Sequence, residues 1–87
     1  MNNELREKFN AALGQDLAGL GPEQRETLFA FINSVRFYRE MGLPRSLNYE
    51  KAIGAIDFLT RSGMVTETVS QRLYDLLRNA AGLRKSS

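Results

Sequence analysis

The stretch SGMVTETVSQRL, residues 62–73, holds polar side chains whose types and spacing could recognise another molecule. Gln and Arg side chains can form two hydrogen bonds with the edge of a base in the major groove of DNA, and Ser and Thr can also bond to bases there. If this stretch entered the groove as a helix, four residues would face the bases, namely Thr68, Ser70, Gln71 and Arg72. These side chains could therefore recognise DNA without catalysing a reaction.

The same stretch has a turn before its helix. Gly63 opens the turn, and Thr68, Val69 and Ser70 lie near the start of the helix that follows. These residues resemble the turn and second helix of LacI-type regulators, in which glycine opens the turn and a Thr-Val-Ser run begins the helix that enters the major groove. The resemblance implies a DNA-binding transcriptional regulator that uses residues 62–81 as a divergent helix-turn-helix.

Three positions depart from that pattern. Leu59 stands where the first helix of the motif has a small residue that lets the two helices cross closely, and Arg72 stands where the second helix buries an aliphatic side chain. Val65 replaces the polar helix cap, a role that falls here to Thr66. These departures favour a helical hairpin, in which Thr66 caps the second helix and the polar residues after it face solvent.

Residue types needed for most enzymatic chemistry are missing. The chain has no cysteine and no histidine, so it lacks a thiolate nucleophile, the commonest metal ligand and the commonest acid–base group at neutral pH. No glycine-rich phosphate loop follows a strand, and no carboxylate pair recurs at the spacing of a di-metal site. Asp16 is interpreted as a helix cap. We therefore expect neither enzymatic activity nor a bound metal or cofactor.

The composition is that of one globular domain. The 87 residues are 43% apolar and 25% charged, a balance typical of folded chains. Residues 1–82 are predicted to form a single helical domain, and residues 83–87, which follow a glycine and lack apolar periodicity, a flexible basic tail. The longest apolar run is residues 28–32, so we expect no signal peptide, no membrane span and a cytoplasmic location.

Charge is distributed unevenly along the chain. Residues 1–44 carry five bases and six acids, whereas residues 45–87 carry seven bases and four acids, giving net charges of −1 and +3. A dedicated DNA-binding domain has a stronger basic excess, because neutralising phosphates supplies most of its non-specific affinity. Nucleic acid is therefore the less favoured partner.

Apolar residues recur at spacings of three and four, and almost no stretch alternates, so the sequence predicts an all-α fold. Four helices are expected. The first follows Asn3 and breaks near Gly14, and the second runs from Pro22 to about Met41. The third is capped by Asn48, and the fourth is capped by Thr66 and ends near Ala81. The last two form a hairpin within a compact four-helix bundle. The predicted buried stripes comprise Leu5, Phe9, Ala12 and Leu13; Leu28, Phe31, Ile32, Val35 and Tyr38; Tyr49, Ala52, Ile53, Ile56 and Leu59; and Val69, Leu73, Leu76, Leu77 and Ala80.

The long second helix is apolar on two sides. Phe37 and Met41 are four residues apart, and they fall nearly opposite the buried stripe. Two interpretations remain open. Either this helix stands at the centre of the bundle with both residues in the core, or it packs against the bundle with one side and meets a partner with the other.

Apolar residues outside the stripes favour a protein-binding function, because surplus apolar surface tends to mark an interaction site. We predict a small regulator, adaptor or inhibitor that binds another protein or a second copy of itself, and its predicted binding residues are Arg36, Phe37, Arg39, Met41 and Phe58. Arg36, Arg39 and Arg45 could contact phosphates, or cover apolar surface with their stems. A DNA-binding regulator is the alternative.

Overall fold

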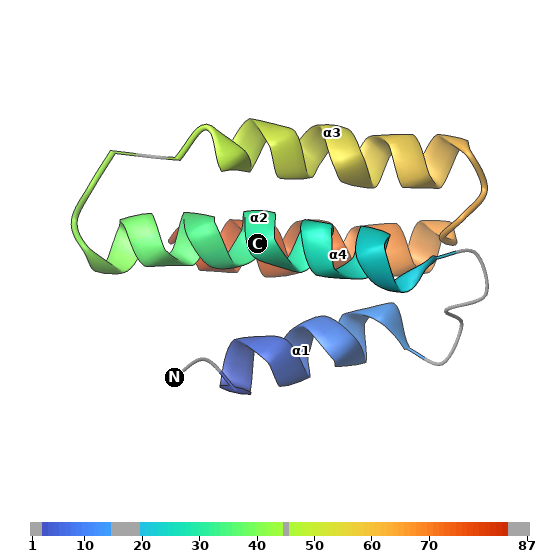
Figure 1. Ribbon diagram of the computed structural model, residues 1–87, viewed down its shortest axis with the longest axis horizontal. Coiled ribbons are helices and arrows are strands. Elements are labelled where there is room, and N and C mark those ends of the chain that lie inside the picture. The colour runs from blue at the N-terminus through green and yellow to red at the C-terminus, as the bar shows by residue number, and fades with distance from the viewer. Residues whose placement is uncertain (1–2, 15–19, 45, 84–87) are drawn as a thin grey trace.

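A computed structural model describes residues 3–14, 20–44 and 46–83, which contain four helices and no strand (Figure 1). The helices are α1 (Asn3–Leu13), α2 (Pro22–Glu40), α3 (Asn48–Arg61) and α4 (Glu67–Ala80). The radius of gyration is 12.3 Å, close to the roughly 12 Å expected of a compact chain of this length. The predicted all-α bundle is confirmed.

Successive helices run in alternating directions along the long axis of the molecule, so α3 and α4 form the predicted antiparallel hairpin (Figure 1). Among the described residues, α2 and α4 each pack against all three other helices, whereas α1 and α3 lie on opposite sides and do not touch. The longer α2 therefore shares the central position with α4. The buried seam of α4 has the five predicted members, Val69, Leu73, Leu76, Leu77 and Ala80.

Local sequence explains where α2 and α4 begin. Pro22 opens α2, and the Gln24 side chain accepts a hydrogen bond of 3.0 Å from the backbone N–H of Gly21. At the start of α4, the Thr66 hydroxyl accepts a hydrogen bond of 3.2 Å from the backbone N–H of Val69. This bond satisfies one of the amides that a helix N-terminus leaves unpaired. The predicted Thr66 cap is confirmed.

The start of α3 differs from the prediction. Asn48 does not cap this helix; it is the first helical residue, and its side-chain amide donates a 2.9 Å hydrogen bond to the Ser34 hydroxyl on α2. The buried Ser46 hydroxyl instead accepts a 3.0 Å bond from the Asn48 backbone N–H. The Asn48 side chain, which the sequence predicted to cap α3, therefore bonds a residue on another helix instead.

Two members of the predicted stripes are exposed. Ile53 lies at the edge of the α3 stripe, turned away from the line through Ala52, Ile56 and Leu59. Tyr38 lies in the last turn of α2, where fewer neighbours cover a side chain. The other predicted stripe residues are buried or, in the case of Phe31, partly buried against the core.

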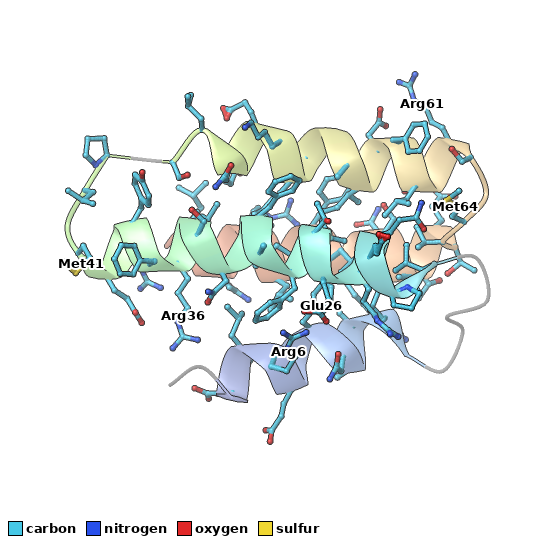
Figure 2. All side chains as sticks on the ribbon, viewed as in Figure 1. Arg6, Glu26, Arg36, Met41, Arg61 and Met64 are labelled. Atoms are coloured by element: carbon cyan, nitrogen blue, oxygen red, sulfur yellow. The ribbon has the colours of Figure 1, made fainter. Side chains whose placement is uncertain are left out.

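α1 is joined to α2 by an ion pair as well as by the core. The Arg6 guanidinium bonds both carboxylate oxygens of Glu26, at 2.7 and 3.0 Å, and lies 3.9 Å from the centre of the Phe29 ring (Figure 2). Hydrogen bonding to Arg6 lowers the pKa of the Glu26 carboxyl below its ordinary value. Since both groups are substantially exposed, this contact adds little to stability but sets how α1 lies against α2.

Some sequence-based expectations lie outside the described residues. These are the cap assigned to Asp16, the role of Arg45, and the tail over residues 84–87. Leu83, the first residue of the predicted tail, is described and partly exposed.

Candidate protein-binding surface

The second apolar face of α2 is exposed. Phe37 and Met41 have 53% and 61% of their surface accessible, whereas Leu28, Ile32 and Val35 on the other side of the helix are buried. The rings of Tyr38 and Phe37 pack edge to face, with their centroids 6.3 Å apart. Phe37 and Met41 therefore do not belong to the core of this chain.

The C-terminal end of α2 carries another exposed apolar side chain, Leu43. The backbone N–H of Leu43 bonds the Tyr38 carbonyl at 2.9 Å, and that of Gly42 bonds the Arg39 carbonyl at 3.1 Å. This pair of bonds is the Schellman motif, which requires the positive φ of +70° that glycine adopts without strain. The motif turns the chain back so that Leu43 lies next to the last turn of α2, where it is exposed.

α4 ends in the same way beside α2. Because α2 and α4 run parallel, their C-termini meet at one end of the bundle (Figure 1). There Gly82 has a φ of +80°, and the N–H of Leu83 bonds the Arg78 carbonyl at 2.9 Å. Leu43 and Leu83 line a pocket of about 300 Å³ between the two helix ends, together with Val35, Arg39, Gly42 and Ala81.

We call the exposed apolar residues at this end, Phe37, Tyr38, Met41, Leu43 and Leu83, the end surface. Sequence reasoning identified Phe37 and Met41 as binding residues and missed Leu43 and Leu83. A signal for the missed pair was present, since each directly follows the glycine that stops a helix. An apolar side chain at that position commonly folds back over the last turn.

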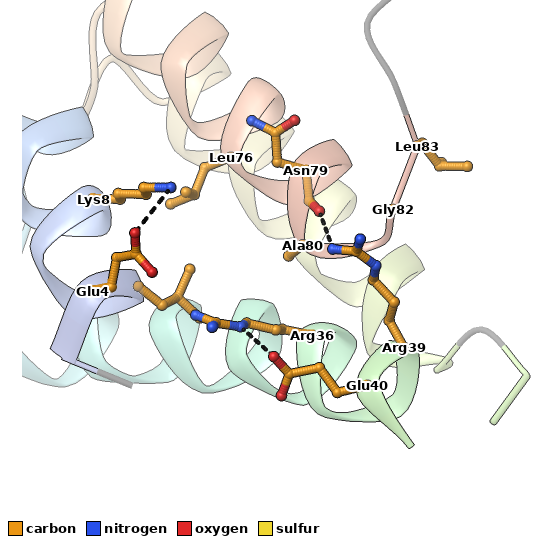
Figure 3. Close-up of a pocket in the computed structure, with 11 residues that line it drawn as sticks. Glu4, Lys8, Arg36, Arg39, Glu40, Leu76, Asn79, Ala80, Gly82 and Leu83 are labelled. Carbon is orange, nitrogen blue, oxygen red and sulfur yellow. Dashed lines mark hydrogen bonds and ion pairs between the residues drawn. The ribbon is translucent and has the colours of Figure 1, made fainter. Parts of the chain in front are cut away.

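Arg36 and Arg39 border the end surface and are both held by hydrogen bonds. Arg36 bonds the Glu40 carboxylate at 3.0 Å, and Arg39 donates a 3.2 Å bond to the Asn79 carbonyl in the last turn of α4 (Figure 3). A cation at the carbonyl end of a helix is favoured by the helix dipole. Arg39 therefore ties the two helix ends together, and it lines the pockets on either side of it.

A second pocket, of about 400 Å³, opens between these arginines and the first turns of α1 (Figure 3). Its charged lining is mixed. The Lys8 ammonium lies 3.8 Å from the Glu4 carboxylate, and the Arg36–Glu40 pair closes the other side. Lys8 and Arg36 are each paired with an acid, whereas Arg39, which also lines this pocket, bonds the Asn79 carbonyl instead, so the charged lining has three bases and two acids.

Phe58, the remaining predicted binding residue, lies elsewhere. It is 60% exposed and lines an apolar groove of about 250 Å³ with Ala55, Leu59 and the first turns of α2, residues 23–28. Figure 2 shows Met41 at one end of the bundle and Arg61 at the other. At 1.5 Å per residue, the groove and Phe37 are separated by about 20 Å along α2. The structure does not bring Phe58 together with the end surface.

The candidate DNA-reading residues do not form one exposed set. Thr68, Gln71 and Arg72 are exposed, but Ser70 is buried and its hydroxyl shares a 2.9 Å hydrogen bond with that of Thr60. The expectation that Ser70 faces a groove or solvent is therefore wrong. The Arg72 guanidinium lies beside the end of α1, 3.6 Å from where a side chain would start at Gly14.

The arrangement of α3 and α4 also differs from a helix-turn-helix. In that motif the two helices cross at about 90–120° so that the second can enter the groove. Here they lie side by side in opposite directions (Figure 1). The turn at residues 62–66 is the corner of a hairpin.

The described residues contain no group of three or more acidic residues placed to hold a metal ion. None of their helices is both long enough and apolar enough to cross a bilayer.

Comparison with known proteins adds no relative. No protein-family model matches the chain, and no curated protein or solved structure is significantly similar to it.

Proposed function

We propose that the chain is a protein-binding module that acts without catalysis, and that a partner protein attaches at the end surface. One observation carries the proposal, namely that Phe37 and Met41 are more than half exposed on a helix face that no other described element covers. Fully burying an exposed side chain of this size contributes about 1.5–3 kcal/mol. Because Phe37 and Met41 are each a little more than half exposed, burying either against a partner contributes roughly half of that.

The composition of the end surface supports this function. Aromatic residues, Met and Arg are enriched in protein interfaces, whereas Lys and Glu are depleted. Phe37, Tyr38 and Met41 are of the enriched types. Arg39 lines the pocket beside Leu43 and Leu83 and has a single hydrogen bond to a carbonyl. The pocket between Leu43 and Leu83 has room for one apolar side chain. We infer a partner that presents an apolar side chain to this pocket and a carboxylate to Arg39.

The variant Phe37→Asp tests this proposal directly. Because Phe37 is half exposed, the new carboxylate stays in water, so the variant is expected to remain folded by circular dichroism. A partner is first isolated with the wild-type chain from an extract of its native host, purified, and titrated calorimetrically. Phe37→Asp is expected to weaken that binding by at least roughly tenfold, the usual loss on removing an interface anchor.

Phe58→Asp is the matched control, since it makes the same change at a similarly exposed phenylalanine on another surface. It is expected to leave the affinity for the partner unchanged. Equal affinity of the wild type and a folded Phe37→Asp variant would contradict the proposal. So would a loss of the same size in both variants.

A further inference from the structure

The Arg39 side chain packs against the backbone of Gly82, just beyond the end of α4. A Cβ added at Gly82 would lie 2.9 Å from the Arg39 Nε and 3.1 Å from its Cδ, closer than a side-chain carbon ordinarily approaches another heavy atom. The same guanidinium donates the 3.2 Å hydrogen bond to the Asn79 carbonyl (Figure 3). A side chain at position 82 would therefore displace Arg39 from the end of α4.

The backbone conformation of Gly82 does not by itself account for this contact. Gly42, Gly63 and Gly82 share a positive φ, between +70° and +80°, which glycine adopts without strain. A Cβ added at Gly42 or Gly63 would meet no atom within 4 Å. Gly82 therefore has a second role besides closing α4, because it leaves the space that Arg39 occupies.

The positive charge of Arg39 is not neutralised by its bond to Asn79, because a carbonyl is uncharged. Arg36, one turn earlier, instead bonds the Glu40 carboxylate. Arg39 and Leu83 are the two residues that line both pockets at this end of the bundle. A guanidinium has five N–H donors in a planar fork, so Arg39 can keep its bond to the carbonyl and also donate to a carboxylate.

We infer that Gly82 is a positioning residue of the end surface. It holds Arg39 where a partner's carboxylate bonds the guanidinium while a neighbouring apolar side chain of the partner enters the pocket between Leu43 and Leu83. The role in binding rests on the proposed function, whereas the contact between Gly82 and Arg39 is a property of the free chain. A displaced guanidinium moves freely in solvent, and ordering it again on binding lowers the affinity.

Urea unfolding of the free chain tests the contact. Gly82→Asn adds a side chain but keeps the helix end, because asparagine tolerates a positive φ better than most residues. Arg39→Met, which removes the guanidinium, should lower the urea midpoint of the wild type and lower that of Gly82→Asn much less. Gly63→Asn is the matched background, with the same backbone conformation and open space, and there Arg39→Met should act as in the wild type. Equal shifts in the three backgrounds, or no shift in any, would overturn the inference.

Calorimetric titration tests the role in binding, with the partner that is purified using the wild-type chain. Arg39→Met is expected to weaken binding by at least roughly tenfold, and Gly82→Asn by roughly three- to tenfold. Added to Arg39→Met, Gly82→Asn should cause no further loss, because the side chain that it displaces is already gone. Gly63→Asn should bind as the wild type does.

The two proposals fail in different ways. A folded Phe37→Asp variant that binds as tightly as the wild type contradicts the proposed function, whatever the urea midpoints show. If Phe37→Asp weakens binding but Gly82→Asn does not, only the positioning role is overturned. It is also overturned if Gly82→Asn weakens binding equally with and without Arg39, because the substitution then acts through another residue, such as Leu83.

Discussion

Arg6 joins two helices with one side chain, by bonding the carboxylate of Glu26 and covering the ring of Phe29. The bond has a pH dependence whose sign follows from the lowered pKa of Glu26. A lowered folded-state pKa means that the stabilisation is fully present above the unfolded pKa of about 4.3. It is then lost as pH falls through the folded value.

We therefore expect Glu26→Gln to lower the melting temperature slightly at pH 7 and to have less effect as pH falls below the unfolded pKa of about 4.3 and through the lower folded pKa, where the wild-type carboxylate becomes protonated. Thermal unfolding followed by circular dichroism across this range measures the difference. Glu7→Gln, which removes a carboxylate at an exposed position on α1, is the control for the change in melting temperature. A difference between wild type and Glu26→Gln that is the same at pH 7 and pH 3 would show that the ion pair does not contribute.

Single polar residues were the hardest to predict from sequence. Asn48 has the chemistry of a cap and Ser70 that of a solvated helix residue, yet each bonds a hydroxyl on another helix. Whether a polar side chain is buried depends on a partner far along the chain, which periodicity does not reveal. Apolar positions were predicted well, because spacing alone decides which side of a helix they share.

At the scale of elements, the start of α4 depends on a single side-chain bond. Thr66→Ala removes the hydroxyl that accepts the Val69 N–H and is expected to cost about 1 kcal/mol of unfolding free energy. Urea unfolding followed by circular dichroism measures the loss. Thr68→Ala, which changes an exposed threonine inside the same helix, should change stability by less than about 0.5 kcal/mol. Equal losses of unfolding free energy in the two variants would show that the Thr66 hydrogen bond does not stabilise the start of α4.

Helix boundaries were predictable because the stop signals are local. Gly42 and Gly82 close α2 and α4 through bonds within the last turn, which a sequence displays directly. What the sequence left open was the exposure of Phe37 and Met41. That exposure depends on where α1 and α3 pack, and both contact α4 without covering the outer side of α2. No pattern within α2 contains this information.

At the scale of the whole molecule, the small net charge of +2 and the antiparallel hairpin lead to an expectation about DNA. Binding to random duplex should be weak and should collapse between about 50 and 200 mM salt, as counterion release requires. Fluorescence anisotropy with labelled duplex measures both properties. Sequence-selective, sub-micromolar binding at about 150 mM salt that is lost on Gln71→Ala and Arg72→Ala would show instead that α4 reads bases.

The central position of α4 has a consequence for the order in which the chain folds. Domains form while they are synthesised from the N-terminus, but here α4, one of the two helices that contact all the others, is the last of the four described. Until it emerges, α1 has only its few contacts with α2, and the apolar stripes of α2 and α3 lack their shared neighbour. The hydrophobic core can therefore close only after residue 80 has left the ribosome, in one late and cooperative step.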